Sequence, residues 1–274
     1  MTHQRIFVLL AFFSTGAYGQ WLNFPTQGTP RTRDGKPNVA ALAPRAPDGK
    51  PDLSGVWEPE PTPSSELNRV LGEHFSDLQL DQRETTKYTV NLFWDLKPEE
   101  YPLRPEAAAI VKQREQAPGP TEFCLPGGIP FAMLITPFKI VQAPREIVML
   151  FEHPDPPRQI HTDGRPLPKD PEPSWLGSST GAWQGKTLVV ETAGFNGQSW
   201  LDEFGHPVSQ SMHLTERYSR RDFGHMDVEM TFDDPKFYTR PFKVKLPMRL
   251  IADSSDVLED VCAENEKDRV HLGR

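Results

Sequence analysis

A histidine and a glutamate in the second half of the chain are the first candidates for chemistry. His213 and Glu216 stand three positions apart in a stretch that alternates between apolar and polar residues. An imidazole and a carboxylate suit general acid–base catalysis, because each can hold or release a proton at moderate pH. We therefore take His213 and Glu216 as the first candidate pair for proton transfer.

The period of two in this stretch predicts a strand with two different faces. One face carries Met212, Leu214, Glu216 and Tyr218, and the other carries His213, Thr215 and Arg217. If the apolar face is the interior, Glu216 is a buried carboxylate, whose pKa rises unless an arginine or tyrosine partners it. If the interior is polar, His213 and Arg217 line it instead. A structural salt bridge from Glu216 to a neighbour of Arg217 or to Arg240 is equally open.

A second candidate set lies at an expected strand end, in the segment His161-Thr162-Asp163-Gly164-Arg165. His161 and Asp163 share a face there, so a base and its orienting carboxylate are possible. Arg165, or Arg240 further along the chain, could then stabilise a developing negative charge. The alternative interpretation is a β-turn in which Asp163 caps backbone amides and Arg165 pairs on the surface.

A divalent metal site is the third possibility. Asp202 and His206 lie in one loop, and His213 and Glu216 lie on the strand that follows it. Imidazoles and carboxylates from a loop and an adjacent strand can converge on a hard or borderline metal. No HExxH motif supports such a site, so no cofactor is expected and a divalent metal remains an option.

Aromatic side chains surround these polar groups and suggest ligand binding. Flat rings with a few carboxylates and histidines suit a sugar ring or an aromatic ligand. The same residues could equally be part of the core. The candidate ligand-binding residues are Trp175, Trp183, Trp200, Tyr238 and Arg240.

The elements that must position these residues are short strands. From residue 138 onward, apolar and polar residues alternate between turn signals, and no helical segment intervenes. We expect a mainly β fold, an antiparallel up-and-down, lipocalin-like barrel of about eight strands, because closure removes exposed sheet edges. The expected strands are 138–142, 146–152, 158–161, 181–184, 186–192, 212–220, 225–232, 242–246 and 256–262.

Two Gly-x-Trp triplets, at Gly55-Val56-Trp57 and Gly181-Ala182-Trp183, are similar to the one that opens the first strand of lipocalin-type barrels, where the indole plugs the closed end. Two ordinary core tryptophans would explain them as well.

The 29 prolines divide the chain into an irregular first half and a strand-rich second half. Residues 20–66 read as an extended proline-rich arm, which carries the repeat Asp34-Gly35-Lys36-Pro37 and Asp48-Gly49-Lys50-Pro51. Residues 67–137 read as a helical and irregular wrapping segment, and 138–274 as the barrel core. One or two short helices are expected, at 64–71 and 105–116.

The N-terminus predicts secretion. A basic start, the apolar run 6–13 and the small residues Ala17 and Gly19 form a signal peptide at 1–19. The mature chain is then periplasmic or extracellular, without stable membrane insertion. Its 29 basic and 38 acidic residues give a net charge of −9, which argues against nucleic acid as a partner. A small-molecule ligand or substrate is the expected partner.

The chain has two cysteines, Cys124 and Cys262. An even pair in an oxidising compartment suggests a disulfide, although two free buried thiols are also possible. The bridge would close a loop of 139 residues. Chain entropy assigns such a loop about 5 kcal/mol.

A series of motifs resembles a family of secreted bacterial proteins that has no assigned activity. The motifs are Asp163-Gly164-Arg165-Pro166, Trp175-Leu176-Gly177-Ser178, Gly181-x-Trp183-x-Gly185-x-Thr187-Leu188-Val189-Val190-x-Thr192, Gly194-Phe195-Asn196, Trp200-Leu201-Asp202, Gly205-His206-Pro207, His213-Leu214-Thr215-Glu216-Arg217 and Asp233-Asp234-Pro235 through Tyr238-Thr239-Arg240-Pro241, flanked by Cys124-Leu125-Pro126-Gly127-Gly128 and Cys262-Ala263-Glu264-Asn265-Glu266. The chain departs from the family pattern at Gln184 and Lys186, where acidic residues are usual, and at Val208, where a second histidine is frequent.

The sequence is compatible with two functions. One is an acid–base enzyme, a lyase, isomerase or hydrolase acting on a sugar-like or aromatic substrate. The other is a non-catalytic, lipocalin-like carrier or sensor whose barrel holds the ligand. Tight co-purification of a ligand that stays unchanged over hours would favour the carrier over the enzyme.

Overall fold

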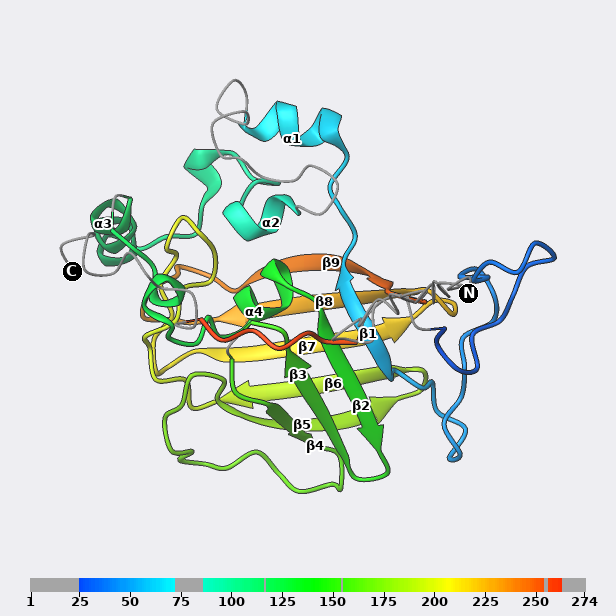
Figure 1. The fold of residues 1–274 in the computed structure, drawn as a ribbon. Coiled ribbons are helices and arrows are strands. Elements are labelled where there is room, and N and C mark those ends of the chain that lie inside the picture. Colours follow the sequence, from blue (N-terminus) through cyan, green and yellow to red (C-terminus); the bar gives the residue numbers. More distant parts are fainter. Residues whose placement is uncertain (1–24, 72–85, 116, 154, 254–255, 263–274) are drawn as a thin grey trace, which may run out of the picture.

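The computed structural model describes residues 25–71, 86–115, 117–153, 155–253 and 256–262. The expected signal peptide, 1–19, lies outside the described residues. Nine strands form a closed barrel, which confirms the mainly β prediction (Figure 1). The strands are β1 (Gly55–Pro59), β2 (Phe138–Ala143), β3 (Glu146–Phe151), β4 (Arg158–His161), β5 (Ser178–Gln184), β6 (Thr187–Ala193), β7 (His213–Arg220), β8 (His225–Asp233) and β9 (Phe242–Leu250).

Each strand pairs with the next along the chain, and β1 pairs with β9 to close the ring. The strand count is nine rather than about eight, and one pair is not antiparallel. β4 and β5 run parallel through Ile160↔Ser179 and His161↔Thr180. Residues 162–177 connect them, and this long connection returns the chain to the end at which β4 began. A wholly up-and-down order would have needed a short turn there.

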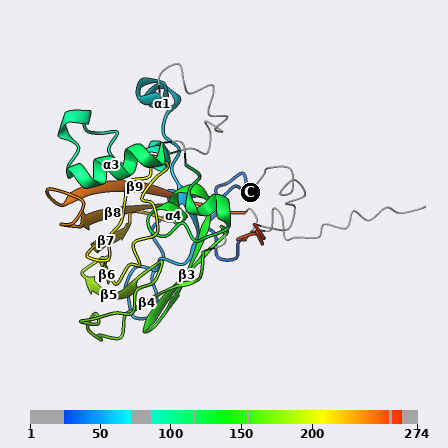
Figure 2. The same ribbon diagram turned by 90° about the vertical axis from the view of Figure 1, so that its left-hand side faces the viewer.

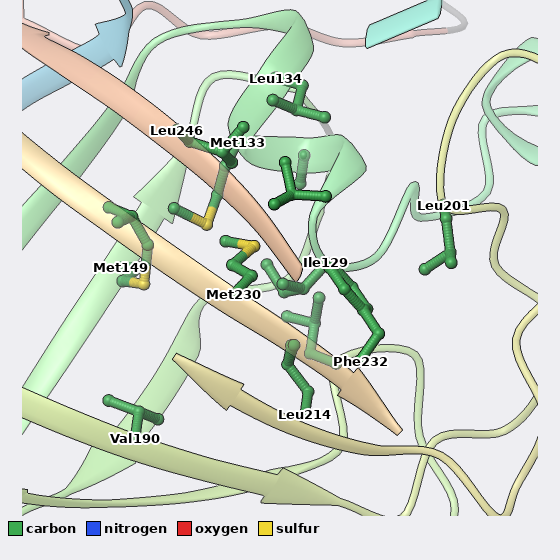
Figure 3. Packing of buried hydrophobic residues seen from close by; sticks show 14 of the residues in the cluster. Ile129, Met133, Leu134, Met149, Val190, Leu201, Leu214, Met230, Phe232 and Leu246 are labelled. Atoms are coloured by element: carbon green, nitrogen blue, oxygen red, sulfur yellow. The ribbon is translucent and has the colours of Figure 1, made fainter. Parts of the chain in front are cut away.

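Alternating side chains fill the barrel interior. On β7, β8 and β9 every second residue is buried, as the period of two predicts. Figure 3 shows Leu214, Met230, Phe232 and Leu246 meeting in the centre of this cluster. The interior is therefore a packed core, and apolar burial is its main source of stability.

A short helix, α4 (Phe131–Ile135), completes this core at one end of the barrel. Its Met133 is wholly buried and points toward Met230 and Leu246 (Figure 3). We call this the helical end, because β2 begins beside α4 and the other helices gather there (Figure 2). These are α1 (Ser64–Leu71), α2 (Lys87–Val90), α3 (Pro105–Arg114) and the 3₁₀ turns Pro98–Glu100 and Pro120–Phe123. The described residues thus hold four short α-helices rather than one or two.

The opposite end carries the hairpins β2–β3, β5–β6 and β7–β8, and we call it the hairpin end. Trp57 of the first Gly-x-Trp triplet is wholly buried there, and its Nε1 donates to the Leu53 carbonyl at 2.9 Å. The Arg220 guanidinium lies 4.9 Å from the centre of its ring. Trp57 thus plugs this end, whereas Trp183 of the second triplet is only half-buried.

Two expectations about the chain termini were wrong. The segment 20–66 is not wholly an arm, because its residues 55–59 form β1 and pair with both β2 and β9. Because prolines flank this short strand, its alternation of apolar and polar residues is too short to be recognised in the sequence. Conversely, residues 256–262 form no strand, and the sheet closes at β9 instead. The tail is held by ion pairs and a disulfide rather than by a strand ladder.

The proline-rich repeat of the arm folds twice into the same turn. Gly35 and Gly49 both adopt positive φ, at 81° and 80°. The Gly35 amide donates to Thr32, and the Gly49 amide donates to Ala46 in the equivalent position. Only glycine adopts this φ without strain, so the two Asp-Gly steps fix two equivalent turns.

Cys124 and Cys262 form the expected disulfide, with Cα atoms 5.6 Å apart. It joins the turn before α4 to the C-terminal tail. No described helix has the length and apolar character to cross a bilayer.

We expect loss of this bridge to lower the free energy of unfolding by about 2 to 5 kcal/mol, because the long loop gains freedom in the unfolded chain. The measurement is urea unfolding of the oxidised protein beside Cys124→Ala/Cys262→Ala. Equal unfolding midpoints would show that the bridge does not constrain the chain.

Candidate functional site

The barrel interior contains one buried ion pair. The guanidinium of Arg158 on β4 donates from Nη1 to Glu216 Oε1 at 2.9 Å, and its Nη2 contacts Oε2. Thr192 Oγ1 accepts from the same guanidinium at 2.9 Å, and Tyr218 donates to Glu216 at 2.7 Å. Burial alone would lower the pKa of Arg158, but the charge and hydrogen bonds of Glu216 outweigh it and raise that pKa. The pair is thus fully satisfied and charged.

His213 does not join this pair. It lies on the outer face of β7, about half exposed, with its Nε2 at 3.4 Å from Glu191. Glu216 points inward, as its apolar neighbours suggested, but its partner is Arg158 rather than Arg240 or a neighbour of Arg217. The structure therefore separates the first candidate pair by the wall of the barrel. Packed side chains surround Glu216, so we interpret the ion pair as a contribution to the stability of the barrel rather than as a catalytic group.

The second candidate set forms a local turn on the surface. Asp163 accepts from the Arg165 amide at 3.2 Å and from its guanidinium at 2.6 Å. Arg165 lowers the pKa of Asp163 to about 2. His161 lies at 3.6 Å from Glu146 rather than beside Asp163. His161 and Arg165 border a small groove of about 290 Å³ beside the β4–β5 seam.

A polar cavity of similar size lies at the helical end, and we call it the mouth cavity. Its volume is about 330 Å³, and it is bordered by the end of α3, the turn 119–122 and the loop 200–203. Its charged and aromatic lining residues are Arg114, Glu115, Glu122, Phe131, Trp200, Asp202 and Glu203.

Glycine allows the wall of the mouth cavity to pack closely. A Cβ on Gly205 would lie 2.8 Å from the Arg114 side chain, and one on Gly119 would lie 3.4 Å from the Trp200 ring. Gly205 also has a φ of +76°. The Arg114 guanidinium stacks at 4.8 Å from the centre of the Trp200 ring and donates to the Gly205 carbonyl at 2.8 Å. The loop 200–205 and α3 are thus locked together.

Asp202 and His206 meet, as the metal hypothesis required, but His213 does not join them. His206 Nδ1 lies 2.6 Å from Asp202, which also accepts from the backbone amides of Leu92 and His206. Phe93 packs edge-on against the imidazole, with ring centres 4.6 Å apart. Among the described residues, no three His, Cys, Asp or Glu side chains gather as a metal site would require. Asp202 therefore orients the imidazole and anchors the loop.

Glu203 and Arg114 are two of the four charged side chains of the mouth cavity that have no oppositely charged partner among the described residues; the others are Glu115 and Glu122. Among the described residues, neither forms an ion pair, and the Glu203 carboxyl has no hydrogen bond. Although Glu203 is an exposed residue, the protein around its carboxyl group raises its pKa, and the charge of Asp202 adds to this. Burial lowers the pKa of Arg114. Both groups are thus available to a ligand.

A second buried carboxylate lies behind the cavity wall. Asp155 accepts from the amides of Gly127 and Gly128 at 3.3 and 3.0 Å and from His153 Nδ1 at 2.7 Å. Gly127 lines the cavity, so Asp155 fixes that part of the wall. Its role is positional, because its oxygens are already used.

The remaining aromatic candidates lie away from the mouth cavity. Trp175 and Trp183 are half-buried against the core, and Tyr238 is buried with its hydroxyl donating to Pro207 at 2.8 Å. Arg240 is exposed, at 3.4 Å from the Glu100 carbonyl. Of the expected ligand-binding residues only Trp200 lines this cavity.

Sequence reasoning missed Arg114 and Arg158 and gave Glu203 no role of its own. Arg158 could have been noticed as a basic residue in an expected strand next to apolar Ile160. Arg114 ends a correctly expected helix, but nothing in its surroundings points to a loop nearly ninety positions away.

Comparisons of the chain with protein-family models, curated proteins and solved structures find no match. The chemistry of the mouth cavity must therefore be inferred from the residues of this chain.

We expect Glu216→Ala to lower the free energy of unfolding by about 3 to 5 kcal/mol, because it leaves the buried Arg158 charge without a partner. The double substitution Arg158→Met/Glu216→Leu should recover most of that loss, since apolar groups of similar volume replace both charges. Urea unfolding of the three proteins measures both effects. Equal stability of Glu216→Ala and wild type would contradict a structural ion pair.

We also expect Glu203→Gln to stabilise the protein at neutral pH. The folded protein raises the pKa of Glu203, so the ionised form is disfavoured relative to the unfolded chain, whose glutamates titrate near about 4.3. Below the pKa of glutamates in the unfolded chain, wild-type Glu203 does not destabilise the protein. The destabilisation grows as pH rises from that value through the pKa of Glu203 in the folded protein. Urea unfolding at pH 3.5 and 7.5 should show equal stabilities at the lower pH only. A constant difference would contradict the raised pKa.

Proposed function

We propose that the protein is a secreted acid–base enzyme that acts on a small sugar-like substrate in the mouth cavity. The observation that carries this proposal is that Glu203 and Arg114 line one cavity and pair with no other charged group among the described residues. Glu203 is exposed and Arg114 is half-buried, so a molecule in the cavity can reach both side chains. Two unpaired groups in one cavity are free to contact a substrate.

The two groups have complementary tasks. Glu203, kept protonated to higher pH by its surroundings, suits the role of general acid. Arg114 is held in place by Trp200 and Gly205, so its remaining N–H groups can bind a substrate oxygen. A fixed acid and a fixed donor in one small space are the requirements for proton transfer to an oxygen.

The cavity suits a polyhydroxylated molecule. Its carboxylates accept hydrogen bonds from hydroxyl groups, Arg114 donates to oxygens, and Trp200 gives an apolar wall. Its volume of about 330 Å³ is at the lower end of the range of ligand pockets, which favours a small ligand. Hydrolysis of a glycosidic bond fits best: Glu203 gives a proton to the leaving oxygen, and Glu115 or Glu122 accepts one from the attacking water.

A secreted location is part of the proposal. The Cys124–Cys262 disulfide supports an oxidising compartment, and the N-terminal sequence has the features of a signal peptide. The carrier alternative receives less support, because side chains and α4 fill the barrel interior where the ligand was expected.

The test is turnover of a panel of disaccharides and their 4-nitrophenyl glycosides. We expect Glu203→Gln to reduce disaccharide hydrolysis by about 10²- to 10⁴-fold, the usual contribution of a general acid. The effect on the nitrophenyl glycoside of the same sugar should be smaller, because its leaving group needs less protonation. Measured rates for both substrates give this ratio directly.

Glu99→Gln is the matched control, since Glu99 is exposed and lies outside the cavity. It should leave both rates unchanged. Equal losses for the two substrates, or a panel in which no sugar is turned over or bound, would contradict the proposed function.

A further inference from the structure

A second and larger cavity lies at the hairpin end, and we call it the arm cavity. Its volume is about 840 Å³, well within the range of ligand pockets. Arm residues 25–28 and Pro44, the start of β1, the β7–β8 hairpin and the segment after β9 border it. Figure 1 shows the arm in blue beside this end of the barrel. The cavity is separate from the mouth cavity at the helical end.

The arm is fixed over this end by specific contacts. The Thr26 amide donates to Asp253 at 3.0 Å, and Arg31 donates to the same carboxylate at 2.7 Å. Further along, the amide of Gly224 donates to the Val39 carbonyl at 2.7 Å. A Cβ on Gly224 would lie 2.4 Å from Val39, so the glycine permits this approach. The wall that the arm contributes is therefore held in place.

The wall of the arm cavity includes a buried guanidinium, that of Arg220, which contacts no carboxylate of the described residues. Arg220 is 8% exposed and donates to the carbonyls of Asp52, Ser54, Asp222 and Phe223. These bonds use four of its five N–H groups. Burial lowers its pKa to about 10, so it stays charged at neutral pH.

The two nearest carboxylates do not neutralise this charge by contact. The Asp52 carboxylate accepts from the Ser54 amide at 2.8 Å. The Asp222 carboxylate accepts from the Gly224 amide at 3.0 Å and lies 2.7 Å from His225 Nδ1. A buried cation without a bound counter-ion favours the arrival of an anion.

The rest of the wall is largely apolar. Val56, Phe223, Leu250 and Ile251 contribute side chains to it. A second cation, Lys139, lies on this wall and pairs with the exposed Asp256 at 2.5 Å. Because Asp256 is exposed and Lys139 only half-buried, the net contribution of the pair to stability is small, and a ligand anion can replace Asp256 at little cost.

We propose that the arm cavity binds a small organic anion with an apolar body, whose acidic group lies near Arg220 and Lys139 while its body contacts Val56, Phe223 and Leu250. This site is independent of the mouth cavity and of the acid–base function proposed there.

The test uses 8-anilinonaphthalene-1-sulfonate, a fluorescent probe with an apolar ring system and one negative charge, with the mature protein. We expect one probe per chain, displaced by decanoate but not by decylamine. Val56→Trp should fill the cavity and weaken probe binding at least tenfold. Lys139→Gln should weaken it at least threefold without altering the cavity volume.

Two controls match these variants. Val141→Trp places the same side chain at an exposed position of β2 outside the cavity, and Lys243→Gln removes an exposed charge on β9. Both should bind the probe as the wild type does. Three results would overturn the proposal: no probe binding by the wild type, wild-type affinity for the probe in both Val56→Trp and Lys139→Gln, or displacement of the probe by decylamine.

Discussion

The interior ion pair between Arg158 and Glu216 is the constraint on which the barrel depends. The parallel β4–β5 seam has only two residue pairs in register, so its strand hydrogen bonds are few. Arg158 reaches from β4 past Ser179 on β5 and Thr192 on β6 to Glu216 on β7. One side chain thus ties four strands together across the weakest part of the ring. The cost of burying the charge is offset because its partners satisfy it within hydrogen-bond distance.

Because side chains pack the interior, the cavities of the protein lie at the two ends of the barrel. Met133 from α4 and the apolar residues of β7 to β9 leave the centre to side chains, and Trp57 closes the opposite end. The cavities are formed where irregular segments cross those ends: α3 and the loop 200–205 at one, the arm at the other. The irregular first half therefore does more than cover the core, because it supplies most walls at which a ligand can bind.

The sequence predicted the barrel because strand periodicity is a local property. The alternation around Glu216 correctly put it on one face with Leu214 and Tyr218, although the sequence left open which face is the interior. β1 was missed because five residues between prolines are too few to show a period. The partner of Glu216 could not be predicted either, because Arg158 is 58 positions away and the closure of the ring sets their distance.

The difference between local pattern and long-range packing also explains which parts of the candidate site could be predicted. Asp202 and His206 were correctly placed together, because four positions within one tight loop leave little freedom. His213 was grouped with them from its sequence proximity, yet the strand turned it outward. Burial of its carboxyl group and the charge of Asp202 raise the pKa of Glu203, and Arg114, which lines the same cavity, is 89 positions earlier in the chain. A carboxylate becomes a candidate general acid when the fold places no cation beside it. The sequence alone does not show which residues the fold brings near it. The chemistry of this protein is thus decided by long-range packing around residues whose local pattern is ordinary.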